Sequence, residues 1–182
     1  HSRLEVDETI EALWFEIDPK RIGLLGHSEG GLIAPIVAAA RPDSVAFIIL
    51  LAGPGVPGHE GLERQMAAIL TAAGAPKPQV DMALARQKVT LTAVMAGDST
   101  AARQSILDAI AENSSAAGTP APEGQALEEA VEGAMKQLDS PWMRYFLTCD
   151  PRPSLRKTKC PVLILNGGKD AQGGIDYIRQ LV

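Results

Sequence analysis

Seven consecutive apolar residues, Val45 to Leu51, most constrain what this chain can fold into. A strand with one solvated face alternates polar and apolar residues, whereas a strand that is apolar throughout is covered on both faces, as in a parallel sheet. Two shorter runs of the same kind occur at residues 22–25 and 161–165. With helical segments between the runs, the pattern predicts an α/β domain with a doubly wound parallel sheet, of which about three strands are present.

The first apolar run leads into the sequence Gly-His-Ser-Glu-Gly at residues 26–30, and an apolar stretch rich in Gly and Ala follows through Ala40. Such a stretch is typical of a helix that packs closely on a sheet. In a Gly-x-Ser-x-Gly turn between a strand and a helix, the serine Oγ is exposed at the carboxyl end of the sheet. We expect glycine at positions 26 and 30 because a Cβ at either place would collide with the neighbouring strand or helix.

Ser28, at the centre of this turn, is the candidate nucleophile. A serine hydroxyl is a poor nucleophile until a base removes its proton. The helix that begins just after Ser28 directs the positive end of its dipole at the site. The backbone N–H of Glu29 is the candidate oxyanion-hole donor. The bare pattern is weak in a chain with 17 glycines, and the strand before it and the helix after it make it specific.

Residues 57–150 have a different character and predict a helical insertion. Apolar residues at helical spacing predict four helices, near residues 62–70, 79–95, 99–112 and 127–135. Ser140 followed by Pro141 predicts a capped helix that runs to Leu147. The stretch 114–124, rich in Ser, Ala, Gly and Pro, predicts a loop. An insertion of this length indicates a small domain rather than a loop.

Two segments resemble a known family. Residues 18–57, DPKRIGLLGHSEGGLIAPIVAAARPDSVAFIILLAGPGVP, resemble the nucleophile region of bacterial α/β-hydrolases of the EstD carboxylesterase type. Residues 140–170, SPWMRYFLTCDPRPSLRKTKCPVLILNGGKD, resemble the cap exit, late strand and acid loop of the same group. The resemblance implies a hydrolase core with the nucleophile turn at 1–56, a helical cap at 57–150, and the late strand and acid loop at 151–182.

In this superfamily the catalytic residues follow the order serine, acid, histidine, and the acid lies in the loop after a late strand. Asp170, at the end of Gly-Gly-Lys-Asp after the last apolar run, is therefore the candidate acid, with Asp176 as the fallback. Its expected role is to accept the Nδ1–H of a histidine, fix the tautomer and stabilise the imidazolium. The alternative is that Asp170 only shapes a turn, as Asp often does.

None of the three histidines suits the role of the base. His27 precedes the candidate nucleophile and is expected to point away from it, His59 is predicted to be a surface-loop histidine, and His1 is the first residue. The resembling enzymes keep the base after one further strand, so we expect it beyond Val182 in a longer protein. Upstream of a helix predicted at residues 2–15, we likewise expect strands that supply the second oxyanion donor. The 182-residue chain alone is therefore expected to be inactive.

Several side chains of the insertion could line an acyl pocket, although apolar residues at helical spacing more often form a helix core. The apolar candidates are Leu62, Met66, Met82, Leu127, Met135, Trp142 and Phe146. Arg144 and Arg152 could meet a substrate carboxylate, with an exposed surface charge as the simpler interpretation. The simpler interpretation of the Glu29 side chain is an acidic residue favoured by the helix dipole.

Composition excludes several other classes of function. The formal net charge of −5 argues against nucleic acid, since phosphate binding needs clustered Lys and Arg. No apolar run reaches the roughly 18 residues of a membrane span. Cys149 and Cys160 are too few for a disulfide framework or a zinc site, although one disulfide between them stays open. We expect no metal and no cofactor, and the sequence leaves the compartment and the oligomeric state open.

The function that these features predict is a serine acyl hydrolase, which cleaves small-molecule carboxylic esters or thioesters through an acyl-Ser28 intermediate. Two alternatives stay open. A serine peptidase of the prolyl-oligopeptidase type shares the turn around the serine, but such enzymes lack a helical cap at this place. A non-catalytic, hydrolase-like binding module would account for the missing base.

Overall fold

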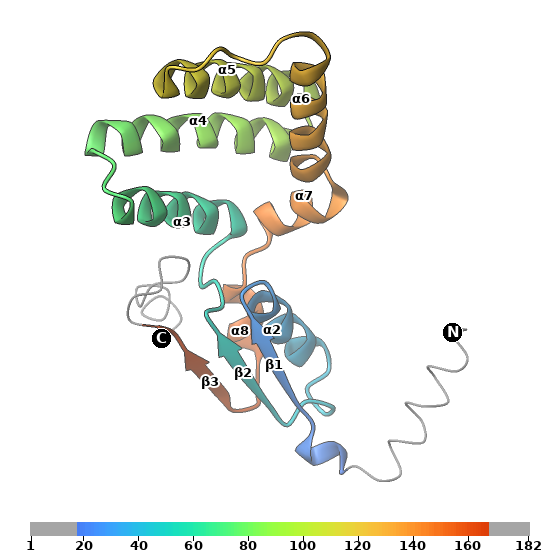
Figure 1. Cartoon of the computed structure of the whole chain (residues 1–182). Helices are drawn as coiled ribbons and strands as arrows, with labels where there is room; N and C mark the ends of the chain where they lie inside the picture. The colour runs from blue at the N-terminus through green and yellow to red at the C-terminus, as the bar shows by residue number, and fades with distance from the viewer. Residues whose placement is uncertain (1–17, 168–182) are drawn as a thin grey trace. The chain divides into compact units, whose positions relative to one another are not determined.

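A three-stranded parallel sheet organises the first and last parts of the chain (Figure 1). The computed structural model describes residues 18–167. The strands lie side by side in the order β1 (Gly23–His27), β2 (Phe47–Leu51) and β3 (Val162–Leu165). Their register aligns the last residues of all three strands, so all three end at the same edge. The predicted mixed α/β fold with a parallel sheet is confirmed.

Two helices, α2 (Gly30–Ala40) and α8 (Arg152–Lys157), pack on one face of this sheet. Alanine at the contact positions of α2 lets the helix approach closely, while Ile48 and Leu50 of β2 are almost fully buried beneath it. Burial of each such side chain contributes roughly 1.5–3 kcal/mol. The buried core of this face comprises Ala34, Ala38, Val45, Ile48 and Leu50.

The opposite face of the sheet presents apolar side chains to solvent. Successive strand residues point to opposite faces. Of the residues that alternate with the core, Ile49 and Leu51 of the central strand are half-buried, and others are exposed. Leu25 is 64% exposed, Leu163 is 50% exposed and Phe47 is 40% exposed. The continuous apolar runs of the sequence therefore supply one face that α2 and α8 cover and a second apolar face.

The chain divides into two compact units, with boundaries after Val56 and after Cys149. The sheet unit holds the described residues 18–56 and 150–167, and it begins with a short 3₁₀ helix, η1 (Pro19–Arg21). The helical unit, Pro57–Cys149, is built around a core of Leu91, Ala93, Val94, Ala102 and Leu147. Its helices are α3 (Gly58–Ala72), α4 (Lys77–Ala96), α5 (Ser99–Ala117), α6 (Gly124–Leu138) and α7 (Pro141–Thr148).

Local capping sets several of these helix ends. The Ser140 Oγ accepts the Met143 N–H at 3.1 Å, and Pro141 is the first helical residue of α7, so the predicted capped start is confirmed. The Asp98 carboxylate accepts the Ala101 N–H at 2.9 Å at the start of α5. Helix α5 ends at Gly118, which has a φ of 65°. Glycine adopts this left-handed conformation without a steric penalty.

Three expectations about the helices need comment. The predicted loop at 114–124 is wrong at its start, because α5 continues to Ala117: alanine is a strong helix former, and only Gly118 ends the helix. Helix α8 was not predicted, and its proline in the first turn favours a helix start there. The helix predicted at residues 2–15 lies outside the described residues. Within residues 18–167, no helix combines the length and apolarity that crossing a bilayer requires.

Candidate functional site

Ser28 has an unusual backbone conformation at the end of β1. It follows the last strand residue, His27, and precedes Glu29, the N-cap of α2. Its φ is 51°, in the left-handed region that residues with a Cβ rarely adopt. The side chain is exposed. A strained residue that persists between two regular elements must be held by its surroundings, and such strain clusters at functional sites.

Backbone hydrogen bonds hold this turn from both sides. The Ser28 N–H donates to the carbonyl of Leu51 in the neighbouring strand at 2.9 Å. The Ser28 carbonyl in turn accepts the N–H of Gly31 at 2.9 Å, and the Glu29 carbonyl accepts the N–H of Leu32 at the same distance. The sheet and the first turn of α2 therefore fix the conformation of Ser28 together.

Two glycines, Gly26 and Gly31, make the close approach of strand and helix possible. A Cβ on Gly26 would lie 2.0 Å from the carbonyl oxygen of Gly30, and a Cβ on Gly31 would lie 2.5 Å from the Cα of Gly53. Both neighbours are backbone atoms that cannot rotate away. The expectation that Gly30 is required in the same way is wrong, because nothing lies within 4 Å of its Cβ position. The tight contact falls on Gly31 instead, since that residue faces the loop after β2.

Ala52 is a second strained residue, directly beside Ser28, that the sequence did not single out. It follows the last residue of β2, has a φ of 49°, and donates its N–H to the carbonyl of Leu165 at 2.9 Å. Because His27 pairs with Leu51, the residues that follow these two strands are neighbours at the sheet edge. The only signal in the sequence is an alanine before Gly53 after an apolar strand, which is too common to be diagnostic.

Asn166 occupies the matching position after β3, at the same edge of the sheet. Its Oδ1 and Nδ2 atoms are both buried and have no hydrogen-bond partner among the described residues. Unsatisfied buried amides are rare in folded proteins. The sequence analysis missed Asn166, although a polar residue between an apolar strand and two glycines was a visible signal. The candidate acid Asp170 and its fallback Asp176 lie outside the described residues.

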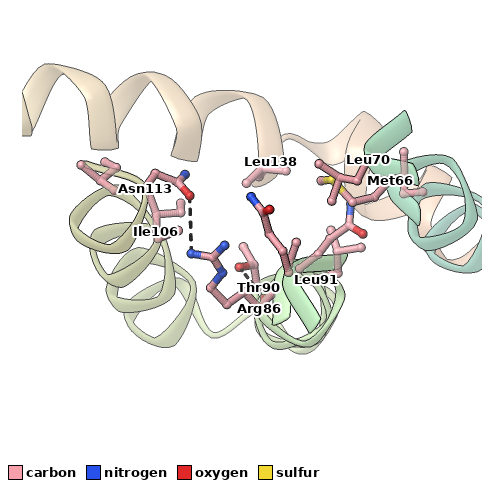
Figure 2. A pocket seen from close by; sticks show the side chains of 14 residues that line it. Met66, Leu70, Arg86, Thr90, Leu91, Ile106, Asn113 and Leu138 are labelled. Atoms are coloured by element: carbon pink, nitrogen blue, oxygen red, sulfur yellow. Dashed lines mark hydrogen bonds between the residues drawn. The ribbon is translucent and has the colours of Figure 1, made fainter. Parts of the chain in front are cut away.

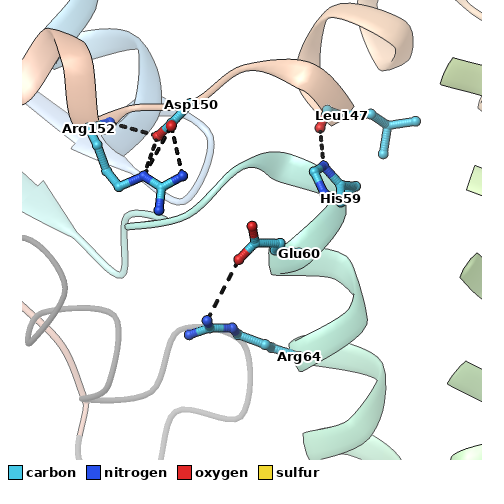
Figure 3. Close-up of polar contacts among 6 residues, drawn as sticks. All are labelled: His59, Glu60, Arg64, Leu147, Asp150 and Arg152. Carbon is cyan, nitrogen blue, oxygen red and sulfur yellow. Dashed lines mark hydrogen bonds and ion pairs between the residues drawn. The ribbon is translucent and has the colours of Figure 1, made fainter. Parts of the chain in front are cut away.

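The two described histidines occupy different environments. His27 is exposed at the end of β1. The expectation of a surface-loop position for His59 is wrong, since His59 lies in the first turn of α3 and is partly buried. Its Nδ1–H donates to the carbonyl of Leu147 in α7 at 2.9 Å, which ties the two ends of the helical unit together (Figure 3).

The two arginines proposed for a substrate carboxylate both pair with carboxylates of this chain. Arg152 donates from Nε to Asp150 Oδ1 and from Nη2 to Asp150 Oδ2, at 2.8 Å each (Figure 3). The Arg152 hydrogen bonds lower the pKa of the Asp150 carboxyl below its ordinary value, although burial opposes this. Arg144 donates to Asp139 at 2.8 Å. The hydrogen bond from Ser99, followed by that from Arg144, lowers the pKa of the Asp139 carboxyl.

The apolar candidates of the insertion separate into three environments. Leu62, Met135 and Phe146 pack against the core of the helical unit. Met82 is 53% exposed and Trp142 is 49% exposed, so neither lies in the core. The Trp142 ring stacks on that of Phe146 with 5.4 Å between ring centroids. Leu62 also lines a cavity of about 520 Å³, together with Met66, and all residues that line this cavity belong to the helical unit.

Metal-binding residues do not gather in the part of the chain that the structure describes. No three side chains of the types His, Cys, Asp and Glu within residues 18–167 could hold one ion together. Cys149 and Cys160 are both free thiols. At the carboxyl edge of the sheet, the described residues bring together a serine hydroxyl on a strained turn, the N-terminus of α2 and the Asn166 amide.

Comparison with known proteins leaves the family open: no model of a protein family matches the chain, and no curated protein matches it. A functional assignment therefore rests on the residues and their geometry alone.

Proposed function

We propose that this chain belongs to a serine acyl hydrolase with an α/β-hydrolase core, in which Ser28 is the nucleophile that attacks a carboxylic ester or thioester. The observation that carries the proposal is the φ of 51° at Ser28, between a parallel strand and a helix that Gly26 and Gly31 allow to approach. A strained, exposed serine on such a turn is the geometry that presents the nucleophilic Oγ in this class of enzyme, and the base then activates it. An ordinary turn has no need for a serine there, because glycine would fit without strain.

The proposed reaction has two steps. In the first, the Ser28 Oγ attacks the carbonyl carbon while a histidine takes its proton, and the N–H of Glu29 donates to the developing oxyanion. The tetrahedral intermediate collapses to acyl-Ser28, and the leaving alcohol or thiol takes the proton from the imidazolium. In the second step, the same histidine deprotonates a water that attacks the acyl carbonyl. The C–O bond to Ser28 then breaks, the imidazolium returns its proton to Oγ, and the carboxylic acid is released.

The proposed base is a histidine other than His27 and His59. His27 precedes the nucleophile in the strand, and the ring of His59 is engaged with the carbonyl of Leu147. In the order serine, acid, histidine, the base follows Asp170, which we propose as the acid that orients it. Asn166 supports the idea of a polar site at this edge, because its buried amide has no partner among residues 18–167 and it follows β3 directly, four residues before Asp170 in the sequence.

A doubly wound core is part of the same proposal. Such a sheet carries helices on both faces, and the exposed Leu25, Phe47 and Leu163 form an apolar surface opposite α2 and α8. We further propose that the helical unit is the cap of the enzyme and selects its acyl substrates.

Substitution of Ser28 tests the proposed function. In the full-length protein, Ser28→Ala is expected to lower kcat/KM for p-nitrophenyl butyrate by about a thousandfold or more, because the nucleophile is lost. The matched control is Ser44→Ala, an exposed serine in the loop between α2 and β2, which is expected to leave the rate unchanged. Equal rates for Ser28→Ala and the unaltered protein would refute the proposal. Cleavage of a prolyl p-nitroanilide in preference to the ester would assign the peptidase activity instead.

A further inference from the structure

The helical unit contains a cavity between α3, α4 and α5 (Figure 2). Its volume is about 520 Å³, within the range of roughly 300–1,000 Å³ that is usual for small-molecule sites. Protein interiors are normally packed with few voids larger than a water molecule. The cavity is partly open to solvent, so a molecule of this size can enter it without the helices separating.

Most of the cavity wall is apolar. Met66 and Leu70 come from α3, Leu91 from α4 and Ile106 from α5, and Leu138 closes the wall from α6 (Figure 2). A wall of this kind removes alkyl groups from water, which is favourable in proportion to the area buried. The larger part of the occupant is therefore an aliphatic chain.

Gln87 adds one polar group that lacks a partner. Its side chain lines the cavity, while its Oε1 is buried behind the wall with no hydrogen-bond partner among the described residues. A carboxamide offers both an acceptor oxygen and a donor nitrogen, and half a turn of the last torsion exchanges them. A ligand hydroxyl can donate and accept, so it complements this group in either orientation.

The charge of the cavity wall is already balanced. Arg86 Nη1 donates to Glu112 Oε2 at 2.7 Å and lies 3.5 Å from Asn113 Oδ1. The guanidinium and this carboxylate neutralise each other. An anionic head group would compete with Glu112, and a cationic one with Arg86, so a neutral head group fits best.

We propose that the helical unit binds a neutral aliphatic alcohol of medium chain length, with the alkyl chain among the apolar residues and the hydroxyl on Gln87. This site lies wholly within residues 57–149 and does not depend on the hydrolase function proposed for Ser28. The apolar wall favours an aliphatic chain. The Gln87 carboxamide, whose Oε1 has no partner among the described residues, favours a hydroxyl, and the Arg86–Glu112 pair favours an uncharged molecule.

Methionine methyl signals offer a direct test in the full 182-residue chain. Met66 lines the cavity, whereas Met82 is 53% exposed and is not among the residues that line it. In ¹³C-methyl-methionine protein titrated with 1-hexanol, we expect a saturable shift of the Met66 signal and none at Met82. Shifts that grow without saturation, or that affect both methyls equally, would overturn the proposal.

The chemistry of the head group is tested with matched probes. Dipropyl ether can only accept a hydrogen bond, and hexanoate carries a charge. We expect both to bind more weakly than 1-hexanol. Gln87→Met keeps the side-chain length and removes the amide, and it is expected to weaken 1-hexanol binding about tenfold, equivalent to about 1.4 kcal/mol. Tighter binding of hexanoate, or unchanged 1-hexanol binding by Gln87→Met, would contradict the assignment.

A second variant keeps the test independent of Gln87. Ala109→Leu adds three carbons to the cavity wall on α5 and is expected to abolish the Met66 shift. The control is Ala85→Leu, the same change on the exposed side of α4, which is expected to leave 1-hexanol binding intact. Circular dichroism of both variants checks that the helices are retained. Undiminished 1-hexanol binding by folded Ala109→Leu would place the ligand elsewhere and refute the site.

Discussion

The sheet unit and the helical unit hold their shapes in different ways. In the sheet unit, backbone meets backbone: a methyl group at Gly26 would lie 2.0 Å from a carbonyl oxygen, and one at Gly31 would lie 2.5 Å from a Cα. In the helical unit such a contact occurs where α3 begins, since a Cβ on Gly58 would lie 2.1 Å from the carbonyl oxygen of Phe146. Farther along, a cavity of about 520 Å³ remains between α3, α4 and α5, and nothing lies within 4 Å of the Cβ position of Gly133 in α6. Backbone contact therefore fixes the turn at Ser28, whereas the helices around the cavity leave space between them.

Polar contacts follow the same division. The turn at Ser28 is fixed by main-chain hydrogen bonds to Leu51 and Gly31. The donors and acceptors of these bonds are backbone atoms, not side chains. The helical unit instead joins its helices through pairs of long side chains at its surface, such as Arg103 with Glu132 and Arg86 with Glu112. Exposed ion pairs contribute little individually. A candidate catalytic serine therefore lies in the unit with the stricter geometry, and the proposed ligand cavity in the more adaptable one.

Exchange of glycine for alanine at the turn is expected to give the largest effect. Gly26→Ala would force the backbone of α2 away from β1 and is expected to destabilise the protein by about 3 kcal/mol or more, at the upper end of overpacking effects. Gly30→Ala, four residues away, meets no atom within 4 Å and is expected to be neutral or to stabilise by up to about 1 kcal/mol through helix propensity. Urea unfolding followed by circular dichroism compares the two variants. Similar midpoints for both would refute the claim that backbone contact governs the sheet unit.

Exchange of alanine for glycine is expected to have opposite signs in the two units. Ala52→Gly relieves a φ of 49° in the sheet unit and is expected to stabilise by about 1 kcal/mol. Ala85→Gly lies on the exposed side of α4 in the helical unit and is expected to destabilise by about 1 kcal/mol. Thermal unfolding of the two variants measures both shifts. A destabilising Ala52→Gly would mean that the left-handed conformation at Ala52 carries no strain.

The smallest expected effect on stability comes from the titration of Asp139, a carboxyl of the helical unit. Hydrogen bonds from Ser99 and Arg144 lower the pKa of this carboxyl in the folded state. A lowered pKa stabilises the fold at pH values above the ordinary Asp pKa of about 4, and that contribution disappears as the pH falls through the lowered value. Asp139→Asn is therefore expected to be less stable than the unaltered protein at pH 6, and the difference is expected to shrink below about pH 4. A difference that stays constant across this range would exclude titration of Asp139 as its cause.

Patterns within short segments predicted much of the fold. The continuous apolar runs predicted parallel strands, the small apolar residues 30–40 predicted α2 with its bounds, and Ser140-Pro141 predicted the start of α7. These features depend on neighbours within a few residues, so the sequence contains their causes. The end of α5 was misjudged because composition alone does not locate the residue that adopts a left-handed conformation, here Gly118.

Features that depend on distant segments escaped prediction. The need for glycine falls on Gly31 rather than on Gly30, because the loop at Gly53 approaches α2 there. The strain at Ala52 and the buried amide of Asn166, which has no partner within residues 18–167, arise where three strands end together. The ring of His59 was assigned to a loop because its partner, the carbonyl of Leu147, lies 88 residues away. The candidate nucleophile was accessible to sequence reasoning because its turn is local, whereas Asp170 lies outside the described residues and stays a prediction.

Covalent labelling of Ser28 tests the account most directly. The full-length protein is treated with a fluorophosphonate, which reacts with activated serines. The modified residue is then located by fragmentation mass spectrometry of the peptide that carries both Ser28 and Ser44. We predict stoichiometric phosphonylation of Ser28, none of Ser44, and none of the Gly26→Ala variant. An unmodified Ser28 in folded protein, or equal labelling of both serines, would contradict the claim that this turn creates a nucleophile.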